Sequence, residues 1–280
     1  MTARLRAWAA TLSPLTVRVL SGVLVALALV LLLAVGRWGV YLIILVLGGV
    51  SLWEFRGLSE RMGHRAPSWL LFPLGVYFTL SGTLLTEIPV QVVLAVALIG
   101  GLSVFLVLPG RLGGLGRWAM GLAGAVYIGM PFNYYLLLYQ SAHRAPGVAW
   151  LALVVLTVAV SDVAALLIGM RIGRHPFFPS VSPRKTVEGA LVGLACSVPV
   201  MLAGGLLLLD LPALHAAVLG LLIGVAAQVG DLVESQMKRL AGVKDSSNLI
   251  PGHGGVLDRI DSALFPPIIV FLYVSLLHLQ

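Results

Sequence analysis

The sequence predicts an all-α, polytopic integral membrane protein with about nine transmembrane helices and one domain over residues 1–280. The composition is the first observation: 59% of the residues are hydrophobic, 10% are charged, and the mean hydropathy is +1.03. A soluble domain of this length does not have such a composition. The second observation is that apolar runs of about 20 residues, the length that crosses a hydrocarbon core, recur along the whole chain.

Nine apolar segments are expected to cross the bilayer. The first follows three arginines and resembles a secretory signal, but it is longer than a signal core and a second span follows at once, so we expect a retained helix. The second, eighth and ninth are short, which allows tilting or a break. In chain order the expected spans are 17–35, 38–53, 69–87, 90–108, 118–139, 148–170, 187–209, 213–229 and 262–277.

Basic residues support this count independently of hydropathy. The net charge is +7, and lysines and arginines precede the first expected span or follow the even-numbered ones. Only Arg37 and Arg144 fall on the other side. The positive-inside rule therefore predicts a cytoplasmic N-terminus, cytoplasmic even-numbered loops and an outside C-terminus.

The charges concentrate in a polar stretch at 229–261. In a helix, Asp231, Glu234, Ser235 and Lys238 would share one face. The following segment 251–255, Pro-Gly-His-Gly-Gly, cannot continue a helix, and its glycines allow positive φ values that turn backbone N–H groups toward an anion. This pattern predicts a loop that binds phosphate.

A second pair of carboxylates, Asp258 and Asp261, follows that loop with the spacing of one helical turn. Carboxylates beside a phosphate site indicate magnesium, which takes oxygen ligands and substrate phosphates. The alternative is a loop whose charges only keep it in water. That alternative is favoured for each lysine and arginine taken alone, but not for Asp231, Asp258 and the glycine turn together.

Another polar constellation begins at Asp162, in the middle of an apolar run. An ionisable group there costs about 2.5–3.5 kcal/mol on insertion scales, which makes it a candidate functional residue. The loop at 171–189 follows. In it, Ser182-Pro183 before Lys185-Thr186 predicts the start of a helix, where N–H groups and a cation can hold phosphate oxygens.

Both segments, 171–189 and 230–261, resemble the phosphatidate cytidylyltransferases, also called CDP-diacylglycerol synthases. The departure lies after Asp162, where 163–166 lacks the glycine or aromatic residue often found in the family. Glu54 resembles a further family element, with an interfacial carboxylate paired to Arg56 or Arg65 as the alternative. The matching positions are Gly173, Arg174, His175, Ser182, Pro183, Lys185, Thr186, Glu188, Gly189, Ser235, Lys238, Arg239, Lys244, Asp245, Pro251, His253, Gly254, Gly255, Asp258, Arg259 and Asp261.

The resemblance implies that CTP and phosphatidic acid react to give CDP-diacylglycerol and pyrophosphate in phospholipid biosynthesis. It implies Mg²⁺, leaves a second, monovalent cation open, and sets the site at the cytoplasmic face of a bacterial inner membrane. The expected partners are the two substrates and the lipid bilayer, without nucleic acid, and a homodimer is left open. The family's metal-binding aspartates fall on Asp231 and Asp258, which we expect to converge on a common ion, with Asp162, Asp245 and Asp261 as second candidates.

The remaining site residues are assigned by the same resemblance. The catalytic set is Asp231, Asp258, Lys238, Arg239, Asp245 and Asp261, and the substrate-binding set is Ser182, Lys185, Thr186, Glu188, Lys244, Gly252, His253, Gly254, Gly255 and Arg259.

Two other functions remain open. The first is a cytidylyl- or phosphotransferase that acts on another, isoprenoid, lipid. The second is a secondary transporter in which Asp162 and Asp231 bind a coupling ion, although this leaves the glycine turn without a purpose. A disulfide within the chain is excluded because Cys196 is the single cysteine, and a zinc site is disfavoured because the histidines lack ligand spacing.

Overall fold

Helices form the regular secondary structure of the protein. The computed structural model describes residues 35–107, 114–140, 147–250 and 254–279. The helices are α3 (Arg37–Arg61), α4 (Ser68–Leu80), α5 (Val90–Val107), α6 (Leu115–Gln140), α7 (Gly147–Ile172), α8 (Val187–Leu208), α9 (Ala213–Leu240), α10 (Leu257–Ile260), the 3-10 turn η1 (Asp261–Ala263) and α11 (Pro266–Leu276). The all-α prediction is confirmed for these residues, in which β pairing is limited to two isolated bridges.

The helices coincide with eight of the nine expected spans; the first, 17–35, lies almost wholly outside the described residues. Within these residues, six helical segments are long and apolar enough to cross a membrane: α3, α6, α7, α8, α9 and the run Leu257–Leu276. Two more apolar helices, α4 and the stretch Val90–Val104 of α5, are shorter. The protein is therefore a polytopic membrane protein with six candidate spanning helices in its described part, and the count of nine is not confirmed.

Two helices continue beyond the apolar spans that the sequence predicted. We expected the second span to end at residue 53 and the eighth at 229, but α3 continues to Arg61 and α9 to Leu240. The expected ends were set at the first charged residues. A helix needs only its backbone hydrogen bonds to continue, and each extension buries one carboxylate against other parts of the protein, Glu54 in α3 and Glu234 in α9.

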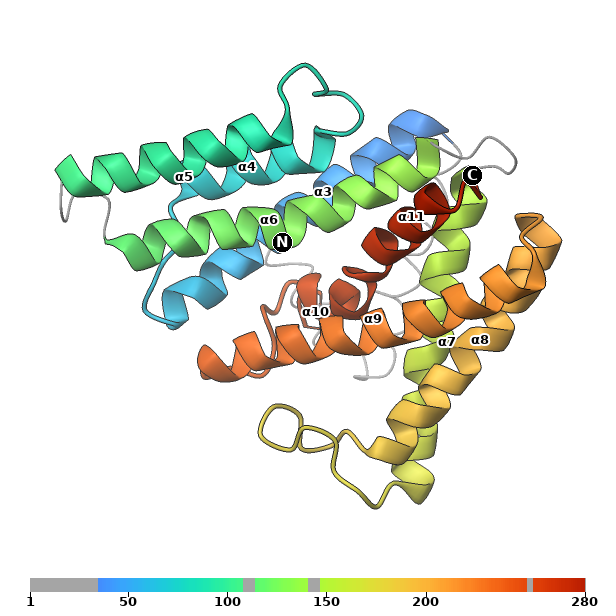
Figure 1. Cartoon of the computed structure of the whole chain (residues 1–280). Helices are drawn as coiled ribbons and strands as arrows, with labels where there is room; N and C mark the ends of the chain where they lie inside the picture. The colour runs from blue at the N-terminus through green and yellow to red at the C-terminus, as the bar shows by residue number, and fades with distance from the viewer. Residues whose placement is uncertain (1–34, 108–113, 141–146, 251–253, 280) are drawn as a thin grey trace, which may run out of the picture.

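The helices form two groups joined by α9 and α11 (Figure 1). Helices α3 to α6 pack together on one side, α7 and α8 form a pair on the other, and α11 touches both α6 and α9. Glycines let α7 and α8 approach closely: a Cβ on Gly189 would lie 2.6 Å from the carbonyl oxygen of Ala165. The buried core includes Leu52, Phe78, Ile128 and Leu136.

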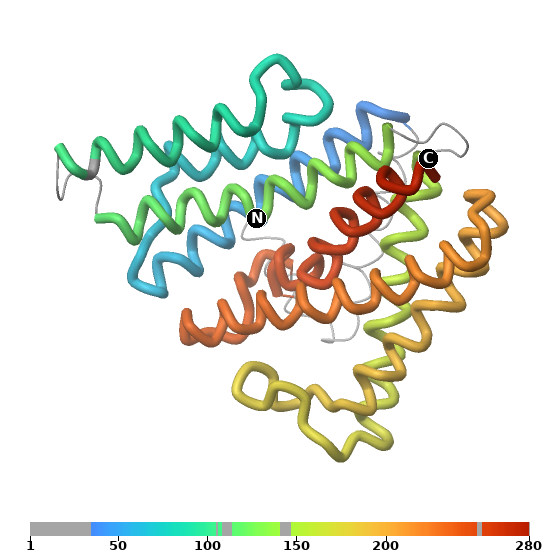
Figure 2. The backbone as a smooth tube through the Cα atoms, viewed as in Figure 1, coloured from blue at the N-terminus to red at the C-terminus, as the bar shows by residue number. Residues whose placement is uncertain are grey.

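Three polar segments meet at one end of this arrangement. They are the last turns of α3, the connection between α7 and α8, and the end of α9 with the loop after it. The backbone trace shows that connection projecting beyond the ends of α7 and α8 (Figure 2). Because α3, α7 and α9 all finish at this end, residues far apart in the sequence are brought together there.

Candidate active site

The centre of the polar end is Lys238, on the last turns of α9. Its Nζ pairs with Glu234, one helical turn earlier, and donates to Asp258 Oδ1 at 2.7 Å. The Glu234 side chain is completely buried, and that of Asp258 is only 4% exposed. The lysine therefore joins α9 to α10 and balances two carboxylates that have little access to water.

Asp258 also holds the loop between α9 and α10. Its Oδ2 accepts three hydrogen bonds, each 2.8 Å long, from the backbone N–H and hydroxyl of Ser246 and from the N–H of Gly255. The predicted glycine turn is present in part: Gly254 has φ +82°, and a Cβ there would lie 3.0 Å from Asp258 Oδ2. Gly252 and His253 lie outside the described residues.

Glu54 on α3 fastens the same loop from the opposite side. This side chain belongs to a residue that is 1% exposed. Its Oε1 accepts from Ser247 Oγ at 2.6 Å and from Val256 N at 2.9 Å. Its Oε2 accepts from Leu257 N at 2.6 Å and, at 3.3 Å, shares the Ser246 hydroxyl proton that is donated to Asp258. Four donors from two stretches of the loop thus meet one carboxylate.

The alternative that pairs Glu54 with an arginine is wrong. Arg65 pairs with Glu60 at 3.2 Å, and Arg56 Nε donates to the carbonyl of Ala66 at 3.2 Å. The signal in the sequence was a carboxylate between Trp53 and Phe55, directly after an apolar run. Hydropathy alone did not reveal its partners, which are about 190 residues later in the chain.

The two predicted site segments contact each other. Lys185, between α7 and α8, pairs with Asp231 Oδ2 on α9 at 2.6 Å, and Asp231 Oδ1 accepts from Ser235 Oγ at 3.2 Å. Arg239 Nε donates to the carbonyl oxygen of Val181 at 3.0 Å. Residues 171–189 and 230–261 therefore adjoin in the fold.

Further carboxylates lie near Asp231. Asp261 is 8% exposed, and its Oδ1 accepts from the backbone N–H of Ser262 at 2.7 Å. The Ser262 hydroxyl donates to Asp261 Oδ1 at 3.3 Å, and Asp162 lies close enough to interact with Ser262, Asp231 and Asp261. Packing is tight here, because a Cβ on Gly230 would lie 2.4 Å from the carbonyl oxygen of Asp261. The midspan aspartate thus belongs to the same polar region as the signature segment.

The arrangement of acids bears on the expected metal site. Among the residues that the structure describes, no three Asp, Glu, His or Cys side chains are grouped so that they could hold a metal ion by themselves. Asp231 and Asp258 each pair with a lysine of their own, Lys185 and Lys238 respectively. A common ion for these two aspartates stays a prediction.

The other predicted residues surround this centre. Thr186 Oγ1 accepts from Gly189 N at 3.2 Å and caps α8, which confirms the predicted helix start. Glu188 accepts from the backbone N–H of Arg174 at 3.1 Å and contacts His175 Nδ1 at 2.5 Å. It therefore holds the base of the α7–α8 connection. Ser182 lies within that connection, and Arg239, Lys244, Asp245 and Arg259 are exposed around the site.

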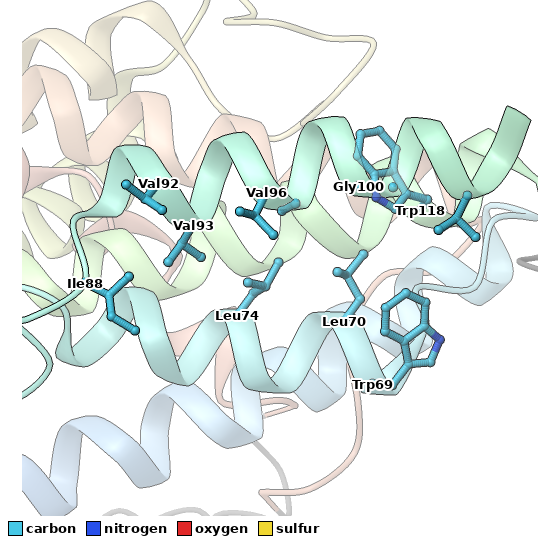
Figure 3. A pocket seen from close by; sticks show the side chains of 12 residues that line it. Trp69, Leu70, Leu74, Ile88, Val92, Val93, Val96, Gly100 and Trp118 are labelled. Carbon is cyan, nitrogen blue, oxygen red and sulfur yellow. The ribbon is translucent and has the colours of Figure 1, made fainter.

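A cavity elsewhere in the protein does not belong to this site. It has a volume of about 430 Å³ and lies between α4, α5 and α6 (Figure 3). Its walls are apolar side chains such as Leu74, Val92 and Val96, with Trp69 and Trp118 at one end. No charged group lines it among the residues that the structure describes, so these walls offer nothing that would bind a triphosphate.

Comparisons with known proteins identify the family. A sequence model of the Cytidylyltransferase family matches residues 16–277. The phosphatidate cytidylyltransferase of Bacillus subtilis (strain 168) is 30% identical over 269 residues, which cover 92% of this chain and 96% of that protein. The enzyme of the same name from Staphylococcus aureus (strain COL) is 40% identical over 149 residues, 52% of this chain and 55% of that protein. The chain belongs to the cytidylyltransferase family and is a nucleotidyltransferase.

Proposed function

We propose that this protein is an enzyme of phospholipid biosynthesis that transfers the cytidylyl group of CTP to phosphatidic acid and releases pyrophosphate. The observation that carries the proposal is the contact between the two signature segments, in which Lys185 meets Asp231 at 2.6 Å. The relatives named phosphatidate cytidylyltransferase support the choice of substrates, and one of them aligns over nearly its whole length.

The reaction needs two anions to be held in line. A phosphate oxygen of phosphatidic acid attacks the α-phosphorus of CTP, a new P–O bond forms, and the bond to the leaving pyrophosphate breaks. No protein nucleophile is needed, so the protein contributes orientation and charge. Lys185, Arg239, Lys244 and Arg259 are the cations that we assign to phosphate oxygens.

Lys238 has a different assignment. Its ammonium group already lies between two buried carboxylates, Glu234 and Asp258, so little of its charge is available to a phosphate. We assign it to positioning: it keeps Asp258 in place, and Asp258 keeps the glycine turn in place.

The residues present fit a magnesium ion that is held jointly by the protein and the substrate. Magnesium is commonly bound by one or two carboxylates together with substrate phosphates, so a cluster of three acids is not required. Asp231 is the best ligand because its Oδ2 meets only the Lys185 ammonium, and Asp261 and Asp162 add negative charge nearby. Asp258 would have to exchange one of its four donors for the ion. When bound, the ion would supply charge neutralisation at the phosphates.

The site is assigned to the cytoplasmic side of a bacterial inner membrane. The α7–α8 connection and the end of α9 are rich in lysine and arginine, which favours the cytoplasmic face. CTP is available on that side. Phosphatidic acid would reach the site from the bilayer, because exposing each CH₂ of its acyl chains to water costs about 0.8 kcal/mol.

A substrate panel tests the function. Purified protein in lipid nanodiscs receives Mg²⁺, each of the four ribonucleoside triphosphates in turn, and either phosphatidic acid or an isoprenoid phosphate, and the lipid product is identified by mass. We expect CDP-diacylglycerol with CTP and phosphatidic acid alone. A product formed only from the isoprenoid phosphate would replace the proposed lipid substrate, and solute transport without nucleotide consumption would reject the enzymatic proposal.

A further inference from the structure

The connection between α7 and α8 is a folded hairpin, and we call residues 173–186 the α7–α8 hairpin. Its two arms are joined by backbone hydrogen bonds from Phe177 N to Lys185 O at 2.8 Å and from Val187 N to His175 O at 2.9 Å. The tip is closed by bonds from Val181 N and Ser182 N to the carbonyl of Phe178, at 3.0 and 2.9 Å. The hairpin therefore presents its side chains in a defined direction.

An aromatic ring is exposed at the tip of this hairpin. Phe178 is 53% exposed and has φ +52°, a conformation that is strained for a bulky side chain. Phe177 packs edge-on against it, with ring centroids 4.8 Å apart. Met170 and Ile172, at the end of α7, are also exposed. An exposed ring that is held by a strained backbone gains nothing in water, so it indicates an apolar environment.

Three arginines belong to the same segment as these apolar side chains. Arg171, Arg174 and Arg184 are exposed, and none of the ion pairs found among the described residues involves them. Between residues 171 and 189 the single acid is Glu188, which is engaged by His175 and by backbone N–H groups. This surface thus combines a positive charge with exposed apolar groups.

We propose that the α7–α8 hairpin rests on the bilayer surface, with Phe178 below the headgroups and the three arginines on the phosphates of anionic phospholipids. Helices α7 and α8 are both candidate membrane spans, so the hairpin that joins them emerges at the membrane surface. Basic residues around an apolar anchor are the chemistry that recognises an anionic lipid surface. A nucleotide would satisfy the arginines and could stack its base on the ring, but it would leave the exposed Met170 and Ile172 without an apolar environment.

The hairpin also contains Lys185, which contacts Asp231. Arg184 is the sequence neighbour of Lys185, so an anionic lipid bound by Arg184 is held next to the proposed active site. Lipid binding at the hairpin goes beyond the proposed reaction and does not depend on it, because a surface that binds any anionic phospholipid would do so without CTP.

The test uses a reporter on the hairpin. Cys196→Ala removes the single cysteine, Ser180→Cys provides one exposed labelling position beside Phe178, and a fluorophore is attached there. The labelled protein is placed in nanodiscs that contain phosphatidylcholine and phosphatidylglycerol, with bromine on the acyl chains of one lipid or the other. Phosphatidylglycerol is anionic and is not the proposed substrate, so the reporter measures surface binding separately from catalysis.

We expect stronger quenching by brominated phosphatidylglycerol than by brominated phosphatidylcholine at equal content. The preference should fall by about fivefold for each of the three arginines changed to glutamine. Phe178→Ser should reduce quenching by both lipids. The matched controls are Arg65→Gln, an arginine already paired with Glu60, and Leu249→Ser, an exposed apolar residue outside the hairpin; neither should change the signal.

Three results would overturn the proposal. Absence of quenching by either lipid would reject insertion of the hairpin tip. Equal quenching by the two lipids, unchanged after the arginine substitutions, would reject recognition of anionic headgroups. Loss of the lipid preference in millimolar inorganic phosphate or CTP at constant ionic strength would assign the arginines to a soluble phosphate instead. Loss of cytidylyl transfer with intact quenching would count against the proposed function alone.

Discussion

Replacement of Glu54 by glutamine should release the loop that carries the glycine turn. The glutamine amide group keeps one acceptor oxygen and puts an NH₂ group where the other oxygen was, so the N–H of Val256 or Leu257 faces a donor. Both residues are buried. One unsatisfied buried donor costs about 1–3 kcal/mol, which is about a 5- to 150-fold shift between the seated and displaced loop.

Hydrogen exchange measured by mass spectrometry in nanodiscs reports this shift directly. The amides of residues 254–257 should exchange faster in Glu54→Gln by the same factor, and kcat/KM for CTP should fall with them. The matched control is Glu60→Gln on the same helix, because Glu60 is exposed and its ion pair with Arg65 is a surface contact worth about 0–1 kcal/mol. If the amides of 254–257 exchange at the same rate in Glu54→Gln and in the unmodified protein, then Glu54 does not hold the loop in place.

The other predictions concern the metal, the buried ion pairs and the helix contact. Asp231→Asn should lower Mg²⁺-dependent conversion of labelled CTP into lipid by about 100-fold or more, while Asp210→Asn, exposed beyond α8, leaves it unchanged. Lys238→Met should lower the free energy of unfolding by about 3–5 kcal/mol, because two buried carboxylates lose their common cation. Gly189→Ala should cost about 1–3 kcal/mol, since its Cβ meets a backbone carbonyl, whereas Gly49→Ala meets nothing within 4 Å.

Each of these predictions has a contradicting outcome. Full Mg²⁺-dependent activity in Asp231→Asn would remove that residue from the ligands. Thermal unfolding in detergent, followed by tryptophan fluorescence, should separate the other two variants from the unmodified protein. An unchanged midpoint for Lys238→Met would mean that water reaches the two carboxylates. Equal midpoints for Gly189→Ala and Gly49→Ala would mean that α7 and α8 are free to move apart.

The apolar runs were sufficient to predict the helices, because a membrane-spanning helix is specified by local hydropathy. They were not sufficient for helix ends. The helix α9 crosses from an apolar to a polar environment without interruption, so the end of its apolar run at residue 229 does not mark the end of the helix. Hydropathy also did not predict that α4 ends at Leu80, because the sequence has few charged residues from there to residue 87.

The candidate site was predictable where its residues are close in sequence. Gly254 has the positive φ that was expected of the turn. The contact between the two segments, through Lys185 and Asp231, agrees with the family resemblance and does not follow from spacing in the sequence. The partners of Lys238 and Glu54 were not predictable, since they depend on how α3, α9 and α10 pack. A carboxylate that binds metal and one that binds backbone N–H groups look alike in a sequence.

The hydrogen bonds of Glu54 have a consequence for folding during translation. After Glu54 is added to the chain, the ribosome must add about 190 more residues before the serines and backbone N–H groups that donate to its carboxylate have been made. At about 5–20 residues per second that interval is about 10–40 seconds. During that interval Glu54 lies at the end of an apolar span without its final partners. The last turns of α3 can reach their final packing only after residues 246–257 have been made, so this contact forms late in translation or after it.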